Sequence, residues 1–261
     1  MIERLDLDRR EKAAESVVRE AGALALRYRA GPLAGLGVAE KGRLDLVTAA
    51  DRAVERMVIE RLGETFGDGV LGEEYGGAAA ERLWVVDPID GTFNYIHGNP
   101  HWAISLAFVA GGATRLGFVY NPAREEFFAA RLGAGATLDG APIAPSGAAN
   151  LDRPLLEVGQ GHRDTIDDYA ELLRRVVAAG CEFRRMGSAA LGLAQVACGR
   201  TDAYYQRHIQ SWDVLAGLLV AREAGAATND FLAGDGLLSG NLVLAATPPL
   251  RDKVAAIFGI A

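Results

Sequence analysis

Acidic side chains follow two short apolar runs in the first half of the chain. In "VLGEEYGG", Glu73 and Glu74 come directly after an apolar pair and a glycine, and in "LWVVDPIDGT", Asp87 and Asp90 come after a second apolar run. Carboxylates held close together in partly buried surroundings repel one another and resist ionisation unless a cation shares the site. Oxygen ligands without histidine or cysteine favour magnesium, manganese or calcium over zinc.

Each of these acids also has a simpler explanation, as a solvated turn residue or a helix cap beside a glycine. For Glu74 we adopt the simpler explanation. For Glu73, Asp87 and Asp90 together, the apolar runs that lead into both turns favour a metal site. Asp213, which opens the apolar stretch "DVLAGLLVAREAGA", is on local sequence alone an N-terminal helix cap.

The elements that must position these acids can be predicted from the surrounding pattern. Apolar residues at helical spacing predict an amphipathic helix over residues 8–29, and a second helix from Asp51 to the "GETFGDG" break. The run "LWVV" is typical of a buried strand, Pro88 prevents its ladder from simply continuing, and the following glycine and threonine allow a turn into a helix. Short β-prone runs over residues 102–143 are typical of antiparallel hairpins.

The second half of the chain alternates between predicted strands and helices. Strands are predicted at "LLEV", "CEFRR" and "NLVLAAT", and helices at residues 165–179, 188–199 and 212–225. This alternation indicates sheet layers covered by helices. With no repeat or flexible linker in the sequence, we expect residues 1–150 and 151–261 to form two lobes of a single structural unit, divided near residues 146–153.

Composition restricts the classes of function. Half of the 261 residues are apolar, and 34 acidic against 27 basic residues give a net charge of −7, which argues against nucleic-acid binding. An acidic protein that handles anions would need a cation at its site. The sequence contains no signal peptide and no apolar segment of membrane-spanning length, so we expect a cytoplasmic protein without membrane contact. Cys181 and Cys198 are too few for a disulfide framework.

The motifs that hold these acids resemble a known family. The segments "GEE" at 72–74, "WVVDPIDGTFNY" at 84–95 and "WDVLAGLLVAREAGA" at 212–226 resemble the signature segments of the inositol monophosphatase family, in the same order and at similar separations. The likeness extends to "DLVTAAD" at 45–51 and "GSAALGLAQVACGRTDAYY" at 187–205, and so covers nearly the full chain. Of these segments, DPIDGT is highly specific.

The resemblance implies both a fold and an activity. The implied fold is α/β of mixed α+β type, a layered α-β-α-β-α sandwich of the inositol monophosphatase and fructose-1,6-bisphosphatase type. The implied activity is that of a magnesium-dependent phosphomonoesterase, in most relatives dimeric and often inhibited by lithium. We therefore expect a homodimer, and we expect its substrate to be a small-molecule phosphate ester.

The resemblance also implies a set of metal ligands. Carried over by position, Glu73, Asp87 and the backbone carbonyl of Ile89 would hold one magnesium ion. Asp87, Asp90 and Asp213 would hold a second, within a site that takes two or three ions. On this basis Asp213 becomes a ligand candidate as well as a helix cap.

The implied catalytic residues are Glu73, Asp90 and Thr92. Thr92, with Glu73, would orient the attacking water, and the backbone amides of Gly91 and Thr92 would face the phosphate. The residue types suit this reaction, because the transition state of phosphate hydrolysis spreads negative charge over the phosphoryl oxygens and cations neutralise it. Amides at a helix start can hold the remaining oxygens.

Three residues before the second helix have a weaker connection with the site. Lys41 resembles a family lysine near the metal-binding loop, and an exposed loop lysine explains it equally well. Thr48 and Asp51 are expected to cap or brace local structure, and their segment could also contribute contacts around the water-orienting threonine.

The resemblance leaves the substrate open. In the family, the positions of Gly187, Ser188, Ala189 and Gln206 contact the released alcohol. Glutamate is common where Gln206 stands, so recognition of inositol is in doubt. An amide both donates and accepts, which suits a small polyol or sugar-type phosphate such as inositol 1-phosphate. Histidinol phosphate, a nucleotide 3'-phosphate and a non-catalytic regulatory role, with a partner such as transcription machinery, are the alternatives.

Overall fold

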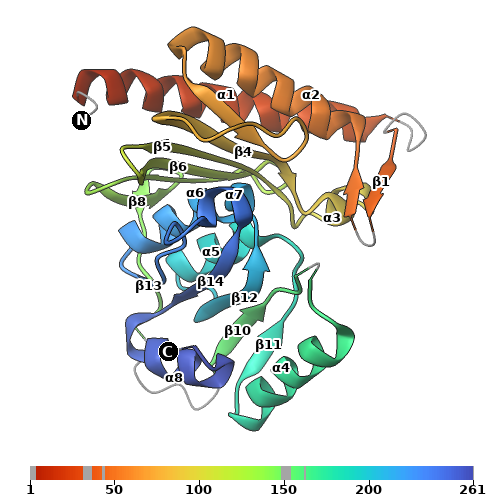
Figure 1. Ribbon diagram of the computed structural model, residues 1–261, viewed down its shortest axis with the longest axis vertical. Coiled ribbons are helices and arrows are strands. Elements are labelled where there is room, and N and C mark those ends of the chain that lie inside the picture. Colours follow the sequence, from red (N-terminus) through yellow and green to blue (C-terminus); the bar gives the residue numbers. More distant parts are fainter. Residues whose placement is uncertain (1–3, 32–36, 43–44, 148–153, 162, 261) are drawn as a thin grey trace.

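Helices and sheets alternate in five layers, α-β-α-β-α, within the described part of the chain (Figure 1). The computed structural model describes residues 4–31, 37–42, 45–147, 154–161 and 163–260. Between residues 40 and 47 it describes no side chains, so the Lys41 side chain lies outside the described residues. The predicted layered fold is confirmed. No helix among the described residues is both long and apolar enough to cross a membrane.

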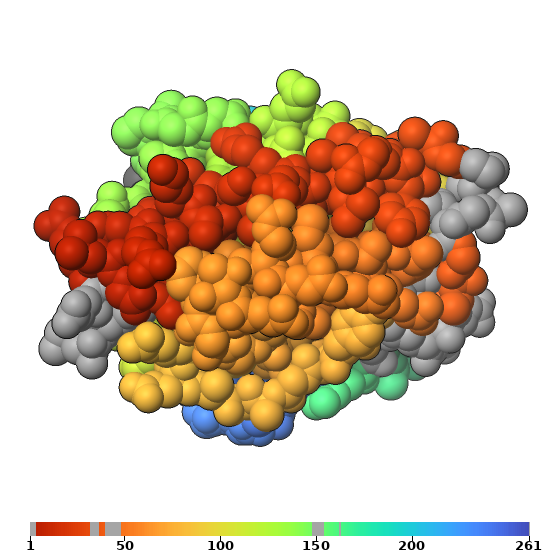
Figure 2. Space-filling model, turned by 90° about the horizontal axis from the view of Figure 1, so that it is seen from above, coloured from red at the N-terminus to blue at the C-terminus, as the bar shows by residue number. Residues whose placement is uncertain are grey.

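Helices α1 (Arg4–Ala30) and α2 (Ala49–Val58) form the first outer layer. They lie side by side across one face of the larger sheet, and their red and orange surfaces cover much of the view in Figure 2. Both helices bury one apolar face against that sheet, as their helical spacing predicts. Thr48 caps α2, and the chain then continues into a π-helical turn, η2 (Ile59–Glu64).

The larger sheet has seven strands in sequence order. Its first two strands are parallel and every later pair is antiparallel, which confirms the hairpins predicted over residues 102–143. The strands are β3 (Gly69–Gly72), β4 (Arg82–Asp90), β5 (Ala103–Ala110), β6 (Ala113–Asn121), β7 (Glu126–Arg131), β8 (Gly135–Leu138) and β9 (Ala141–Pro142).

The middle layer consists of α5 (Ala189–Ala197) and α6 (Ser211–Glu223), which are buried between the two sheets. Because these helices cover the face of the larger sheet opposite α1 and α2, strands β4 and β5 are buried almost throughout. The two helices are rich in alanine, leucine and glycine, and these residues join one core cluster with the inner face of the larger sheet.

The smaller sheet has five strands in the order β11-β10-β12-β14-β13. Its strands are β10 (Leu155–Val158), β11 (Glu182–Arg184), β12 (Ala203–Ile209), β13 (Ala227–Thr228) and β14 (Asn241–Ala246). Helices α4 (Ile166–Ala178) and α8 (Arg251–Phe258) cover its outer face. The remaining elements are β1 (Ala39–Gly42), β2 (Asp45–Val47), α3 (Thr92–Ile96), α7 (Gly236–Ser239) and η3 (Pro248–Leu250).

The two halves of the chain share the middle layer. The larger sheet is built by residues 69–142 and the smaller by residues 155–246, yet α5 and α6 come from the second half and pack against the first. The division into lobes near residues 146–153 stays a prediction, and residues 148–153 lie outside the described residues.

Candidate active site

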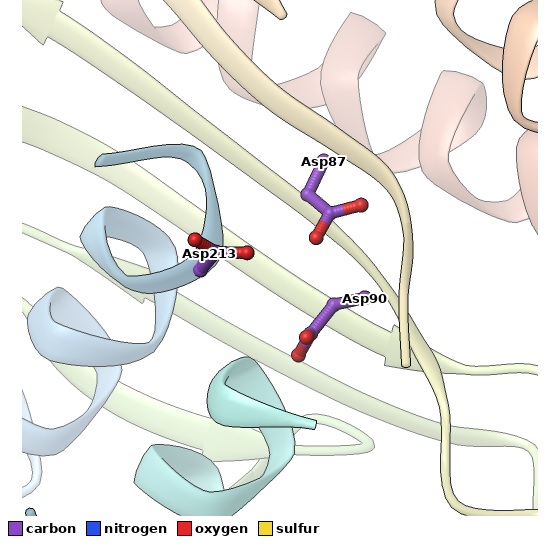
Figure 3. Close-up of side chains that lie close together, drawn as sticks. All are labelled: Asp87, Asp90 and Asp213. Carbon is purple, nitrogen blue, oxygen red and sulfur yellow. The ribbon is translucent and has the colours of Figure 1, made fainter. Parts of the chain in front are cut away.

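Strand β4 carries two of the predicted acids into the interior. Its residues from Leu83 to Asp90 are buried, and its pairing with β5 shifts register between Asp87 and Asp90, across Pro88. The strand therefore continues past the proline, which has no N–H for the ladder. The backbone N–H of Ile89 donates to Asp87 Oδ1 at 2.9 Å. Figure 3 shows the carboxylates of Asp87 and Asp90 directed into the same space.

The start of α6 brings in the third acid. Asp213 lies in the first turn of this helix, where its carboxylate accepts from the backbone N–H of Gln210 at 3.1 Å. One carboxylate oxygen from each of Asp87, Asp90 and Asp213 lies within 4.8 Å of the other two. Figure 3 shows the three side chains close together. The cap of α6 is Gln210, and Asp213 completes its capping box from the third helical position. The role of Asp213 as a metal ligand stays a prediction.

The start of α5 holds the carboxylate of Asp90. Ser188 Oγ donates to Asp90 Oδ2 at 2.6 Å, and the backbone N–H groups of Ala189 and Ala190 donate at 3.2 and 2.7 Å. The N-terminus of a helix stabilises negative charge because its first amides have no partner within the helix. Two residues predicted to contact substrate, Ser188 and Ala189, therefore contact the carboxylate of Asp90.

Burial and mutual repulsion make the cluster hard to ionise. Burial raises the pKa values of Asp87 and Asp213 well above the usual range of an aspartate, and the charge of Glu73 is the next largest cause. Burial also raises the pKa of Asp90 to about 6, although the Ser188 hydroxyl donates to it. Three carboxylates this close together, two of them buried and the third half-buried, require either protons or a cation. Their all-oxygen donor set fits a hard divalent cation.

Glu73 lies beside the cluster on a separate turn. Strand β3 pairs in parallel with β4, and Gly72 lies opposite Val86. Glu73 and Asp87 therefore follow at the same end of two neighbouring strands. The Glu73 carboxylate is not among the three that meet within 4.8 Å, but its charge is the largest cause, after burial, of the raised pKa of Asp87 and Asp213.

The turn after β4 can accept only glycine at position 91. Gly91 has φ 94° and ψ 39°, in the left-handed region, and begins α3. A Cβ at this position would lie 3.0 Å from the carbonyl oxygen of Gly187 and 3.1 Å from that of His101. The turn is therefore pressed against the predicted substrate segment. The assignment of the Gly91 and Thr92 amides to phosphate stays a prediction.

The hydroxyl of Thr92 lies between two acceptors. Its Oγ is 3.0 Å from the carbonyl oxygen of Ile89 and 3.4 Å from Asp51 Oδ1, and its single proton can serve one of them at a time. Asp51 also accepts from the backbone N–H of Thr48 at 2.8 Å and from its hydroxyl at 2.5 Å. Burial raises the pKa of Asp51 to about 7. The expected bracing around Thr92 is thus present in the geometry.

One buried acid in this region was missed from the sequence. Glu55 on α2 accepts from the backbone N–H groups of Glu74 at 2.8 Å and Tyr75 at 2.9 Å, and burial raises its pKa to about 7. The available signal was its position, since Glu55 stands four residues after Asp51, on the same face of the helix, next to the buried Val54.

Gln206, the other predicted substrate contact, is held by its own strand. Its Oε1 accepts from the Tyr204 hydroxyl at 2.9 Å, and its Nε2 donates to the carbonyl oxygen of His208 at 3.2 Å. The side chain is buried, and no hydrogen bond among the described residues joins it to the acidic cluster. Gly187, at φ 81°, leads into α5, and a Cβ there would lie 3.2 Å from Asn94 Nδ2. Substrate contact by Gly187, Ser188, Ala189 and Gln206 stays a prediction.

The chain is similar to known proteins over most of its length. The model of the inositol monophosphatase family matches residues 6–259. The chain is 39% identical over 221 residues to a protein named Nus factor SuhB from Xylella fastidiosa, covering 83% of this chain and 80% of that relative. It is 40% identical over 206 residues to an inositol-1-monophosphatase from Rhizobium meliloti, covering 77% of each.

Solved structures agree over almost the whole length. An inositol monophosphatase from Anabaena (Nostoc) superposes with a TM-score of 0.83 at 31% identity, covering 97% of this chain and 96% of that one. The extragenic suppressor protein suhB from Bartonella henselae superposes with a TM-score of 0.87 at 32% identity, covering 94% and 96%. With the three converging aspartates and the family model spanning the described fold, the chain belongs to the inositol monophosphatase family.

Proposed function

We propose that this protein is a magnesium-dependent phosphomonoesterase that hydrolyses a small polyol or sugar-type phosphate such as inositol 1-phosphate. The observation that carries the proposal is the convergence of Asp87, Asp90 and Asp213 within 4.8 Å, with Asp87 and Asp90 buried and Asp213 half-buried. Like charges brought together inside a protein lower its stability, and a bound cation would offset that repulsion. Family membership points to phosphate ester chemistry for this cluster.

The ligands would divide between two positions. Glu73, Asp87 and the Ile89 carbonyl would hold one magnesium ion, and Asp87, Asp90 and Asp213 a second. When bound, magnesium would lower the pKa of a coordinated water and neutralise the charge that develops on the phosphoryl oxygens.

The protein's own groups would then orient the reactants. Thr92 Oγ would accept a hydrogen bond from the attacking water while it donates its proton to Asp51, and Glu73 would be a second acceptor for that water; the 3.4 Å approach of Thr92 Oγ to Asp51 supports this role. A carboxylate whose pKa lies near 7, as that of Asp51 does, suits proton acceptance near neutral pH. The amides of Gly91 and Thr92 would donate to the phosphate oxygens.

Phosphate release by the purified full-length protein tests this proposal. The substrates are inositol 1-phosphate, glycerol 2-phosphate, fructose 1,6-bisphosphate, histidinol phosphate and adenosine 3',5'-bisphosphate, each with magnesium and with chelator. We expect chelator-sensitive release with a preference for a polyol or sugar phosphate. Preference for histidinol phosphate or for the nucleotide would redirect the substrate assignment without changing the reaction class.

A regulatory binding role is the second candidate function. It is favoured by one observation, that relatives at 37–39% identity carry the name Nus factor SuhB. In that role the fold would bind a partner such as transcription machinery, and hydrolysis would be dispensable. Absence of phosphate release from every substrate in the panel, together with a folded protein, would favour this role over the phosphatase.

A further inference from the structure

The turn that carries Glu73 is closed on itself. Gly72 and Gly76 exchange two backbone hydrogen bonds, at 3.0 and 3.1 Å, and so form the neck of a short turn at the end of β3. Gly76 has φ 68°, which glycine adopts without strain. The neck sets the shape of the turn, but it does not determine where the turn lies relative to the aspartates.

Glu55 supplies that second constraint from α2. Each of its carboxylate oxygens accepts one backbone N–H from the tip of the turn, Oε2 from Glu74 at 2.8 Å and Oε1 from Tyr75 at 2.9 Å. The Glu55 side chain is 0% exposed. Because Glu55 is buried, both hydrogen bonds are shielded from competition by water.

The contact depends on close approach between the carboxylate and the turn. A Cβ at Gly72 would lie 2.0 Å from Glu55 Oε1, so any side chain there would displace the carboxylate from its present position. Position 72 therefore has to be glycine for a reason separate from backbone conformation. A neck without a side chain leaves room for the carboxylate to reach the amides beyond it.

Helix α2 is a firm support for this contact. Thr48 and Asp51 form a reciprocal capping box at its start, and Val54 and Val58 are buried in the core beneath it. A capped helix packed on the sheet moves little, so the carboxylate that it carries fixes the turn to the same sheet that carries Asp87.

We propose that Glu55 is a positioning residue that holds the Glu73 turn against α2 and thereby sets the affinity of the acidic site for a divalent cation. The affinity part of this inference rests on the proposed function, because it takes Glu73 as a ligand. Outer partners that orient metal ligands typically change metal affinity about 10- to 100-fold when they are replaced. Glu55 acts on the backbone that carries the ligand, so we expect the lower end of that range.

Two measurements on the full chain test the proposal. The variant Glu55→Gln keeps the size of the side chain but places an amide NH₂ against a backbone N–H. Glu60→Gln is the matched control, since Glu60 is an exposed glutamate that lies just beyond the same helix. The first measurement is hydrogen exchange of a peptide that covers residues 70–78, without metal. The second is calorimetric titration with Mn²⁺, with no substrate present.

We expect faster exchange of the 70–78 peptide and about tenfold weaker Mn²⁺ binding for Glu55→Gln. The peptide of strand β4 should keep its protection, and Glu60→Gln should match the wild type in both measurements. A general loss of stability would instead raise exchange in both peptides together. Unchanged exchange and unchanged Mn²⁺ affinity in Glu55→Gln would overturn the proposal.

A second variant shows whether the effect of Glu55→Gln comes only from the introduced amide. Gly72→Ala keeps glutamate at position 55, but its methyl group would displace the Glu55 carboxylate from the turn. It should reproduce the faster exchange and the weaker binding, whereas wild-type behaviour would count against the proposal. If the wild type binds no Mn²⁺, the metal-site assignment fails, and the exchange measurement alone then decides whether Glu55 holds the turn.

Discussion

Helices α5 and α2 both support the acidic site, and they do so in opposite ways. We call the contacts made by each helix the α5 side and the α2 side of the site. On the α5 side, the helix start donates hydrogen bonds directly to the carboxylate of Asp90. On the α2 side, the helix supplies the acceptors, and Asp51 and Glu55 bind the Thr92 hydroxyl and the turn that carries Glu73. The first kind of support fixes the carboxylate of Asp90 itself. The second fixes the backbone next to Glu73 and the side chain of Thr92.

The largest effect should come from replacing Asp90, the proposed metal ligand whose carboxylate accepts hydrogen bonds from the start of α5. Asp90→Asn keeps the size of the side chain but removes its charge, so we expect magnesium-dependent phosphate release to fall about a hundredfold or more. The Tm in chelator should change little, because the loss of one repelling buried charge is offset by the NH₂ group of asparagine, which would face a backbone N–H of α5. Undiminished phosphate release would remove Asp90 from the site.

Of the effects compared at one pH, the second-largest should come from replacing Gly91, in the turn that follows β4 and contacts the segment before α5. Gly91→Ala combines a strained φ of 94° with a Cβ only 3.0 and 3.1 Å from two backbone oxygens, and we expect a loss of about 3 kcal/mol in the free energy of unfolding. Gly112→Ala is the control, since Gly112 has φ 73° with nothing within 4 Å of its Cβ position, and strain alone should cost about 1 kcal/mol. Urea denaturation measures both. Equal losses would show that close packing of the turn contributes nothing.

A buried acid behind the α5 side should make stability depend on pH. Burial raises the pKa of Glu157 from 4.5 to about 8, while the Met186 N–H that it accepts lowers it. The folded chain therefore keeps a proton that the unfolded chain loses above about pH 4.5, so stability from this group falls as pH rises toward 8. Since one pKa unit corresponds to about 1.4 kcal/mol, we expect a loss of about 3.5 kcal/mol between pH 5 and pH 8.

Glu157→Gln should remove this contribution from the pH dependence measured in chelator by urea denaturation at the two pH values, while Asp51 and Glu55, whose pKa values burial also raises, keep theirs. Glu171→Gln is the control, because Arg174 and Arg175 lower the pKa of the exposed Glu171 to about 2 and it stays ionised over the whole range. The same slope in wild type and Glu157→Gln would assign the pH dependence to other groups.

The smallest effect should come from a single donor on the α5 side. Ser188→Ala removes the hydroxyl that donates to Asp90 and caps α5, at a cost of about 1–2 kcal/mol. Thr165→Ala, which removes the cap of the outer helix α4, should cost about 1 kcal/mol. The two variants separate in magnesium dependence, because only Ser188→Ala should raise the half-saturating magnesium concentration. The same magnesium dependence in both would mean that Ser188 only caps its helix.

The sequence contained enough to predict the elements and the acids of the site. Helical spacing and hairpin runs depend on residues a few positions apart, and the acids stand at element ends inside recognisable motifs. The residues that hold these acids in place could not be predicted in the same way. Glu55 bonds amides 19 and 20 residues away, and Asp90 accepts from residues about a hundred positions along the chain. A single sequence gives no signal at such separations.

Gln206 shows a different limit of sequence reasoning. Its type and position suggested a group free to contact an alcohol, whereas its amide is bonded to Tyr204 and to the carbonyl of His208. Alternate residues on a strand share a face, so the nearness of Tyr204 follows from the pattern. The orientation of the tyrosine hydroxyl depends on packing against α5, which no local pattern encodes.

The register shift in β4 also has a consequence for insertions and deletions. On a regular strand, side chains three positions apart emerge on opposite faces, so Asp87 and Asp90 would point away from each other. Two residues of β4, Pro88 and Ile89, are accommodated opposite one of β5, between the pairs Asp87–Ser105 and Asp90–Ala103, and this extra residue restores a common direction. Deleting one residue between the two acids would remove the bulge and leave them two positions apart, where regular alternation alone keeps both side chains on one face of the sheet. An insertion or deletion that removed the bulge but kept the spacing of three positions would separate the acids, so the bulge is what allows this spacing to build the site.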